Sequence, residues 1–286
     1  MKSPLVIYHG NCLDGFTAAW VMRGWLEYTG IEPHAVEPTQ YYPAQYAPQG
    51  QRVTLPDVTG RKVWMVDFCT GRDQLLELKA AAADLVVLDH HKTAQSACEG
   101  LDFCTFDMDR SGAMLAWDYC YPGQSPSWLV QYVQDRDLWR FMLPHSREIN
   151  AFLQSRAMTF DAWDSLAGHW EPTRDMRLLG TGALNHLQQY VSEVSRQARV
   201  GRFAGYPHAP IVNAAYVGIS ELLNELAKGA EFAVGWFQNS SGTYTYSLRS
   251  RGDFDVSALA QRFGGGGHKN AAGFTVSERI EEDPKP

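Results

Sequence analysis

Histidine and carboxylate side chains follow three short apolar segments in the first third of the sequence. The segments are residues 5–8, 63–66 and 85–88, and each has the composition of a buried strand. Imidazoles and carboxylates that converge can hold divalent cations, and Mn²⁺ is the usual compromise for mixed oxygen and nitrogen ligands. Two such ions about 3.5–4 Å apart can clamp a phosphoryl group and activate a water for in-line attack. The candidate residues are His9, Asp14, Asp67, Asp89, His90, His91 and, farther along the chain, Asp135.

Each of these residues also has an ordinary structural interpretation. A single Asp at a strand end is more often the N-cap of the next helix, and a single buried His is usually a hydrogen-bonded core residue. Three successive strand ends that each carry an acid or a His are harder to explain as three independent caps. We therefore predict one shared metal centre, with Asp67, on the middle strand, bridging two ions.

Helical segments between the apolar runs predict the sheet that brings these residues together. Residues 16–28 and 74–83 have helical patterns, and the second is rich in Leu, Ala, Glu and Lys. Continuous apolar strands joined by helical crossovers are typical of a doubly wound parallel sheet in an α/β protein. Such sheets bind ligands at the carboxyl ends of their strands, where the candidate residues lie.

The remaining sequence predicts a helical connection and a second domain. Residues 111–205 have mostly helical patterns, with one long helix over 174–203 that Gly180 and Gly182 could break. Beyond Pro210 the character changes to a smaller α/β domain. Its predicted strands are 211–213, 233–237 and 243–248, with a helix at 221–228 and a hairpin turn at 239–242. The predicted boundaries are 1–180 for the catalytic domain, 181–205 for a helical linker, 206–280 for the second domain and 281–286 for a disordered tail.

Composition and charge restrict the function classes. A chain of 286 residues suits two domains, and its net charge of −7 argues against a long footprint on duplex DNA. A small anionic substrate remains compatible, because bound cations reverse the field locally. The five cysteines are odd in number and form no CxxC pair, which indicates reduced thiols in a cytoplasmic protein. No apolar run approaches the ~20 residues of a membrane span, and no signal peptide is predicted.

Several motifs make the sequence resemble a known family. Leu88-Asp89-His90-His91 is similar to the name-giving motif of the DHH phosphoesterases, and residues 263–274 resemble the signature of the accompanying DHHA1 domain. Residues 111–117 and 135–139 are similar to segments of the oligoribonuclease-like (nanoRNase) branch. The resemblance covers nearly the whole chain, with the motifs in the expected order.

The resemblance implies a two-ion Mn²⁺ centre, with Mg²⁺ or Co²⁺ as alternatives, and hydrolysis of phosphodiesters held between the two domains. It implies that Asp89 orients the histidines and that His91 faces the substrate phosphate. It assigns the metal ligands to His9, Asp14, Asp67, His90 and Asp135, with Asp137 as a substitute for Asp135.

The glycine-rich segment of the second domain is the predicted substrate grip. Glycines at 264–267 would let the backbone approach a ligand, and their amides, with those of a helix expected to begin at Ala271, would bind an anion. Arginines at the end of the preceding strand would clamp a phosphate or terminal nucleotide. The candidate substrate-binding residues are Arg249, Arg251, Gly265, Gly266, Gly267 and His268.

One departure from the family pattern concerns the first motif. Asn11 stands where a second acidic ligand could sit, so we expect one weaker metal position and retained activity. Short oligoribonucleotides are the first choice of substrate. Linear or cyclic dinucleotides, cyclic mononucleotides and 3′-phosphoadenosine 5′-phosphate are alternatives. A nucleotide-binding sensor that has lost catalysis is the alternative function, and a homodimer is left open.

Overall fold

The computed structural model describes residues 2–30, 38–47 and 51–280, and the predicted tail at 281–286 lies outside this range. The chain divides into two compact units. The first comprises 1–45 and 53–184, and the second comprises 46–52 and 185–286. Each unit has its own sheet and its own buried core.

The first unit contains a five-stranded parallel sheet in the order β2-β1-β3-β4-β5. The three predicted strands are its centre, and β3 lies between β1 and β4, as expected. The two edge strands were not predicted. Pro43 in β2 argues against a strand at this place in the sequence. Pro is tolerated in β2 because an edge strand leaves one row of amides unpaired. The strands are β1 (Leu5–His9), β2 (Gln40–Ala44), β3 (Lys62–Val66), β4 (Asp84–Asp89) and β5 (Cys104–Phe106).

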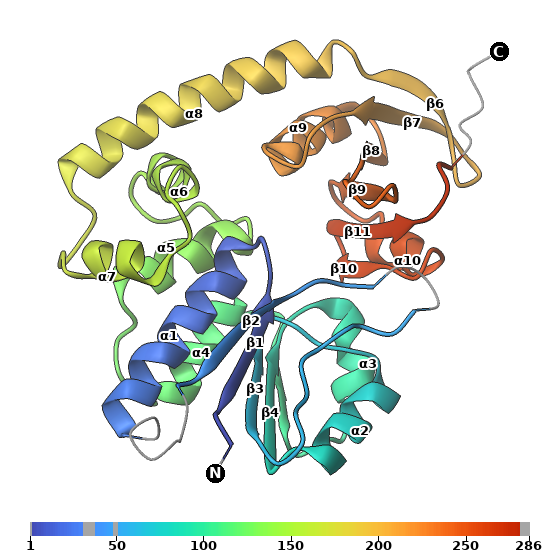
Figure 1. Cartoon of the computed structure of the whole chain (residues 1–286). Coiled ribbons are helices and arrows are strands. Elements are labelled where there is room, and N and C mark those ends of the chain that lie inside the picture. The colour runs from blue at the N-terminus through green and yellow to red at the C-terminus, as the bar shows by residue number, and fades with distance from the viewer. Residues whose placement is uncertain (1, 31–37, 48–50, 281–286) are drawn as a thin grey trace. The chain divides into compact units, whose positions relative to one another are not determined.

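Helices cover both faces of this sheet, which confirms the doubly wound α/β prediction (Figure 1). Because successive strand residues point to opposite faces, Val6 and Val66 pack with α1 and α4, whereas Ile7 and Met65 pack with α2 and α3. Because both faces of these strands are buried, the strands are held firmly in place, and so are the residues at their carboxyl ends. The helices are α1 (Leu13–Thr29), α2 (Arg72–Ala81), the 3₁₀ turn η2 (Lys92–Ala94), α3 (Gln95–Cys98) and α4 (Gly112–Cys120).

A helical segment follows, and its last helix differs from the prediction. Helix α8 runs without a break through Gly180 and Gly182 but ends at Ser195. A Cβ on Gly180 would lie 1.9 Å from the Glu148 carbonyl oxygen, so this glycine permits close packing of α8 on α6. The helices are α5 (Trp128–Asp137), α6 (Ser146–Gln154), α7 (Phe160–Ala167) and α8 (Arg174–Ser195).

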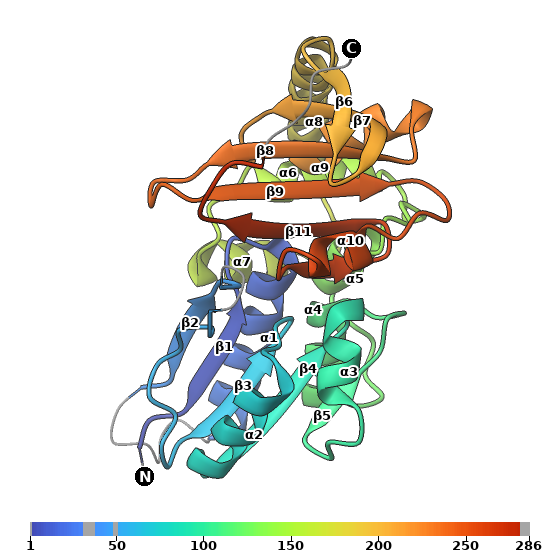
Figure 2. The same ribbon diagram turned by 90° about the vertical axis from the view of Figure 1, so that its right-hand side faces the viewer.

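The second unit contains a six-stranded sheet in the order β10-β11-β9-β8-β7-β6, in which only the β7–β8 pair is parallel (Figure 2). The predicted helix over 199–203 was wrong, because this segment pairs with β7 and buries Phe203. The predicted helix start at Ala271 was also wrong, because this residue begins β11. The elements are β6 (Arg199–Phe203), β7 (Tyr206–Asn213), α9 (Ile219–Leu226), η3 (Ala227–Gly229), β8 (Phe232–Gln238), β9 (Tyr244–Ser250), α10 (Val256–Gln261), β10 (Gly266–His268) and β11 (Ala271–Val276).

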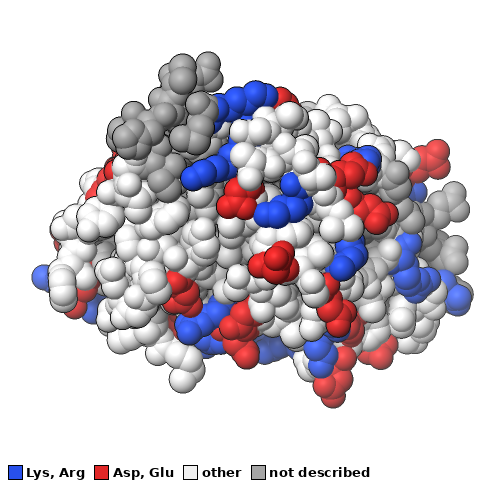
Figure 3. Space-filling view, turned by 90° about the horizontal axis from the view of Figure 1, so that it is seen from below, with Lys and Arg blue, Asp and Glu red and all other residues white. Residues whose placement is uncertain are grey.

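The surface drawn in Figure 3 carries interspersed charges. Lys and Arg side chains alternate with Asp and Glu on this face, and its described residues form no continuous basic band. Among the residues with described coordinates, no helix combines the length and the apolar character needed to cross a bilayer.

Candidate metal centre

The three central strands of the first unit deliver their histidines and carboxylates to one cluster. His9 ends β1, Asp67 directly follows β3, and His90 directly follows β4. Donor atoms of Asp14, Asp67 and His90 all lie within 4.8 Å of one another, and so do donor atoms of His9, Asp67 and His91. Asp67 belongs to both groups.

The two oxygens of Asp67 face different histidines. Asp67 Oδ1 lies 3.0 Å from His90 Nε2, and Asp67 Oδ2 lies 3.5 Å from His9 Nδ1. His90 Nε2 is also 3.6 Å from Asp14 Oδ2. The side chains of Asp14, Asp67 and His90 are 1% exposed, whereas those of His9 and His91 are 24% and 11% exposed. The His9 and His91 side of the cluster is therefore the side open to solvent.

Close backbone packing holds Asp67 in place. Asp67 has a positive φ of 54°, a conformation that L-residues adopt at a cost and that is common at functional sites. A Cβ on Gly112 would lie 2.3 Å from Asp67 Cβ, so only glycine fits at the start of α4. In the sequence, Gly112 is part of the segment 111–117 that resembles the nanoRNase branch. Its steric role becomes apparent only in the folded structure.

The N-terminus of α4 binds the Asp14 carboxylate. Asp14 Oδ2 accepts a hydrogen bond from Gly112 N at 2.6 Å, and Oδ1 accepts one from Ala113 N at 3.0 Å. Ser111 caps the same helix by accepting from Met114 N. Unpaired amides and the helix dipole favour an anion at this position, so the acid is aimed at the cluster by the helix that follows the sheet.

Electrostatics of the cluster favour a bound cation. Burial, reinforced by the charges of Asp67 and Asp137, raises the pKa of Asp14 well above its usual range. Burial also pushes up the pKa of Asp67, but hydrogen bonds from His9 and His90 outweigh it and hold that pKa well below its usual range. Buried carboxylates this close repel one another unless protons or a cation lie between them. The donor set of carboxylate oxygens and imidazoles fits Mn²⁺ or a similar divalent ion.

Asp89 holds the two histidines that follow it. Its Oδ1 accepts hydrogen bonds from His90 N at 2.7 Å, from His91 N at 3.2 Å and from His91 Nδ1 at 2.7 Å. The Asp89 side chain is fully buried. A proton on His91 Nδ1 leaves Nε2 as the second functional nitrogen of that ring. Asp89 therefore contacts both residues that it is predicted to orient, and its functional role stays a prediction.

The structure places Asp137 at the cluster instead of Asp135. Asp137 Oδ2 lies 3.6 Å from His90 Nε2. The Asp135 carboxylate accepts from Met142 N and Leu143 N, so it fixes the loop after α5. Residues two apart on a helix point about 200° apart, so only one of the two acids can face His90. The assignment of Asp135 as a ligand does not agree with this geometry, whereas its substitute Asp137 does.

Asn11 lies in the turn after β1, where it is exposed and has a positive φ of 56°. The expected weakening of one metal position stays a prediction.

In the second unit, the glycine-rich segment folds into a hairpin. A Cβ on Gly265 would lie 2.1 Å from the Gly273 carbonyl oxygen, and one on Gly267 would lie 2.5 Å from the Ala271 carbonyl oxygen. These glycines therefore allow β10 and the preceding turn to pack on β11. The predicted anion site at a following helix start is wrong, because Ala271 continues the sheet.

The candidate arginines and histidine of the second unit differ in their surroundings. Arg249 donates to Ser220 Oγ at 2.7 Å and to its neighbour Leu248 O at 2.9 Å. Arg251 is exposed just beyond the end of β9, and His268 is half-buried at the end of β10.

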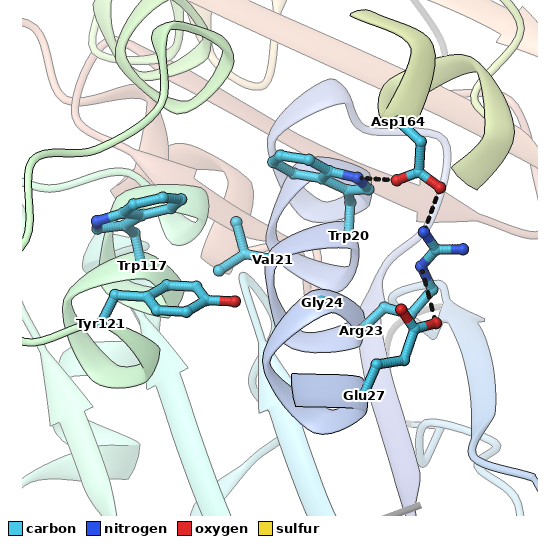
Figure 4. Close-up of a pocket in the computed structure, with 8 residues that line it drawn as sticks. All are labelled: Trp20, Val21, Arg23, Gly24, Glu27, Trp117, Tyr121 and Asp164. Atoms are coloured by element: carbon cyan, nitrogen blue, oxygen red, sulfur yellow. Dashed lines mark hydrogen bonds and ion pairs between the residues drawn. The ribbon is translucent and has the colours of Figure 1, made fainter. Parts of the chain in front are cut away.

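A pocket in the first unit lies apart from these residues (Figure 4). Trp117 of α4 and Tyr121, which directly follows α4, lie on one side of it and Trp20 of α1 on the other, and Asp164 of α7 accepts hydrogen bonds from Trp20 and Arg23. None of the predicted site residues lines this pocket, and its charged groups are paired with one another.

Comparisons with known proteins identify the architecture. Residues 211–283 match the sequence profile of the DHHA1 domain. The DHH domain of a member of the s1p family of ribosomal proteins has a similar fold, with a TM-score of 0.53 and 16% identity over 95% of this chain and 82% of that one. Residues 211–283 therefore match a DHHA1 domain, and the chain has a fold similar to that of a DHH-domain protein.

Two further proteins are similar to this chain. An uncharacterised protein of Acanthamoeba polyphaga mimivirus is 27% identical over 294 residues, which cover 96% of this chain and 67% of that protein. Exonuclease RecJ bound to manganese is similar with a TM-score of 0.49 and 14% identity, over 96% of this chain and 86% of that one. The DHHA1 match includes Arg249, Arg251 and His268, whereas the His and Asp cluster belongs to the first unit.

Proposed function

We propose that this protein belongs to the DHH/DHHA1 phosphoesterases and is a metal-dependent phosphodiesterase that hydrolyses short oligoribonucleotides or linear or cyclic dinucleotides to mononucleotides. The observation that carries the proposal is the position of Asp67, whose carboxylate is common to two groups of metal-donor atoms. A carboxylate shared in this way is what a pair of neighbouring ions needs as a bridge.

Asp14, Asp67, His90 and Asp137 hold one ion in this proposal, and His9 with Asp67 holds a second. The ions are Mn²⁺, with Mg²⁺ or Co²⁺ as alternatives, because the donors are oxygens and imidazole nitrogens. When bound, the metals supply electrostatic stabilisation of the phosphoryl oxygens and a water of lowered pKa.

The protein's own groups orient the reaction. Asp89 Oδ1 holds the His91 ring through a hydrogen bond to Nδ1 at 2.7 Å. The other ring nitrogen, Nε2, is therefore available for a different partner. His91 lies on the solvent-open side of the cluster with His9. We assign its Nε2 to the substrate phosphate: when both ring nitrogens carry a proton, Nε2–H can donate to the charge that develops during hydrolysis while Nδ1–H stays on Asp89.

The DHHA1 domain grips the end of the substrate in this proposal. Arg251 is exposed, and no ion pair involves it among the described residues. The guanidinium group of Arg249 is positioned by its hydrogen bond to Ser220 Oγ. Guanidinium groups bind phosphates through two parallel hydrogen bonds, and His268 adds a further donor. A binding site with so few contacts favours short strands.

A nucleotide sensor without catalysis is the second candidate, and Asn11 favours it because this residue brings no charge where a carboxylate could sit. The buried acids Asp14 and Asp67 favour the enzyme, since a binder of anions would not bury them together. Metal uptake separates the two: a protein that takes up no Mn²⁺ in equilibrium dialysis is the sensor.

The direct test uses end-labelled oligoribonucleotides of two to ten residues, together with linear and cyclic dinucleotides. We expect hydrolysis with Mn²⁺, none in EDTA, and recovery with Mn²⁺ that Ca²⁺ does not match, because Ca²⁺ prefers six to eight oxygen ligands. Undiminished hydrolysis in EDTA would exclude the metal mechanism. The cytoplasmic location and the homodimer stay predictions.

A further inference from the structure

The loop that follows α5 has a strained backbone beside the candidate metal centre. Trp139, Phe141 and His145 have φ values of 56°, 51° and 56°. Bulky side chains rarely adopt this left-handed conformation, and residues held in it are common at binding and catalytic sites. Asp137, whose carboxylate faces His90 in the cluster, precedes the first of these residues by two positions. The loop is therefore a candidate for a role in substrate binding.

Trp139 occupies the position at the end of α5 where glycine is the usual residue. Its N–H donates to the Arg136 carbonyl oxygen at 2.8 Å, and the Arg140 N–H donates to the Asp135 carbonyl oxygen at 2.8 Å. Together with the positive φ of Trp139, these two hydrogen bonds form a Schellman motif. A side chain raises the conformational energy at this position, and glycine would avoid that cost. Termination of the helix therefore gives no reason for a tryptophan here.

Asp135 holds the strained loop in place. Its carbonyl oxygen also accepts a hydrogen bond from Phe141 N at 3.2 Å. Its carboxylate accepts from Met142 N at 2.9 Å and from Leu143 N at 3.2 Å. With Arg140 N, four consecutive amides are bound by this one buried residue. The backbone that carries the aromatic side chains of the loop is thus fixed before any ligand binds.

The loop combines two aromatic rings with arginines. The Trp139 and Phe141 rings pack edge to face, with centres 5.0 Å apart, and Trp139 is still 36% exposed. The Arg147 guanidinium lies 3.8 Å from the centre of the Phe141 ring, and the Arg136 guanidinium lies 5.9 Å from that of Trp139. Residues 136–147 contain three arginines and one aspartate, although the whole chain has a net charge of −7. Aromatic rings among cationic groups are the means by which proteins bind single-stranded nucleic acids.

The exposed ring is close to the metal centre along the chain. The Cα atoms of Asp137 and Trp139 can be at most about 7 Å apart, because only two residues separate them. In a nucleotide, one sugar separates the base from its phosphate, which is a comparable length. A phosphate bound at the cluster therefore brings an adjoining base within reach of Trp139.

We propose that Trp139 stacks on the nucleobase next to the scissile phosphate, and that the loop 139–143 is the base subsite of the first unit. The inference rests on the proposed function and adds contact with a base to contact with a phosphate. Stacking requires only the π-face that every base has, so this subsite discriminates little among bases. Asp135 acts through Trp139, as a positioning residue.

The test measures kcat and KM of the whole chain with Mn²⁺. The substrates are the short oligoribonucleotide that the wild type cuts best and two analogues, each of which lacks one of the two bases beside the scissile phosphate. The variants are Trp139→Gly and Trp139→Phe. Trp170→Gly is the matched control, because Trp170 is 95% exposed in the same unit. Mn²⁺ affinity is measured for every variant by calorimetric titration.

We expect Trp139→Gly to lower kcat/KM on the ordinary substrate by roughly 5- to 100-fold, mainly through KM, because stacking on a base contributes on this scale. Trp139→Phe should recover most of the loss, and Trp170→Gly should match the wild type. On the analogue that lacks the stacked base, Trp139→Gly and the wild type should have equal kcat/KM. Trp139→Gly should fold and bind Mn²⁺ as the wild type does, because glycine suits the left-handed position.

Three results overturn the inference. An equal loss on the ordinary substrate and on both analogues, or a loss of Mn²⁺ affinity, would make Trp139 a support of Asp137 and leave the proposed function intact. An unchanged kcat/KM in Trp139→Gly would remove Trp139 from the substrate site. Absence of hydrolysis by the wild type on every substrate would remove the proposed function and the base subsite with it. Trp139→Asn replaces the glycine variant if the latter does not fold, since Asn also tolerates the left-handed conformation.

Discussion

Asp67 and His90 meet at the carboxyl edge of the parallel sheet of the first unit, with Asp67 Oδ1 3.0 Å from His90 Nε2. The other oxygen of the same carboxylate lies 3.5 Å from His9 Nδ1. A single side chain, directly after β3, thus joins the histidine that ends β1 with the histidine that follows β4. Removing its charge should therefore disturb both groups of donor atoms at once.

We expect Asp67→Asn to lower turnover at least ~100-fold, because loss of ligands and their partners costs metal affinity on this scale or more. The amide has nearly the same shape, so the fold should persist by circular dichroism. Asp73→Asn, at an exposed position in α2, is the matched control and should keep the wild-type rate. A near-wild-type rate in Asp67→Asn would leave this residue with a structural role only.

Asp137→Ala and Asp135→Ala should fail in different ways. We expect Asp137→Ala to weaken Mn²⁺ binding in calorimetric titration with little change in stability, because its carboxylate faces His90. We expect Asp135→Ala to lower the free energy of unfolding by about 1–3 kcal/mol in urea, because the amides of Met142 and Leu143 lose their acceptor. The reverse pattern would restore Asp135 as the ligand.

Gly112→Ala should damage the metal centre by steric contact. The added Cβ would lie 2.3 Å from Asp67 Cβ, which neither backbone can accommodate without shifting. We expect lost Mn²⁺ affinity and lost activity. Gly182→Ala is the matched control, since a Cβ there meets no atom within 4 Å and should stabilise α8 by up to about 1 kcal/mol. Equal metal affinity in both variants would contradict the proposed packing constraint.

His90→Ala and His91→Ala should separate metal binding from substrate contact. His90 is buried against Asp67 and Asp14, so its removal should abolish tight binding of one Mn²⁺. His91→Ala should keep the metal, as measured by atomic absorption, and lower kcat. Metal loss from the His91 variant would make this residue a ligand, in agreement with its place beside His9 and Asp67.

Substrate length should affect the rate of the proposed hydrolysis. A net charge of −7 offers little non-specific attraction for a long strand, so we expect dinucleotides to pentanucleotides to be cut far more efficiently than strands of about twenty. His268→Ala should raise KM or lower kcat on short substrates without removing metal. Equal rates per end on short and long strands would rule out this grip.

The sequence by itself determined the sheet centre and most of the cluster. Continuous apolar runs at 5–8, 63–66 and 85–88 permit few folds other than a buried parallel sheet, and that topology sends all their carboxyl ends to one edge. The convergence of His9, Asp67 and His90 follows from this geometry without knowledge of any contact. The edge strands were missed because their burial depends on neighbours more than on their own composition.

Only the tertiary structure decided the details that depend on direction and close approach. Asp135 and Asp137 are the same residue type and lie close together in the sequence. The orientation of α5 decides which of the two carboxylates reaches His90. The segment 199–203 forms a strand because it pairs with β7. Its local helical pattern contains no information about this distant partner. Gly265 and Gly267 serve the packing of β10 on β11, because a side chain at either position would collide with the neighbouring backbone, whereas the sequence pattern indicated a ligand loop.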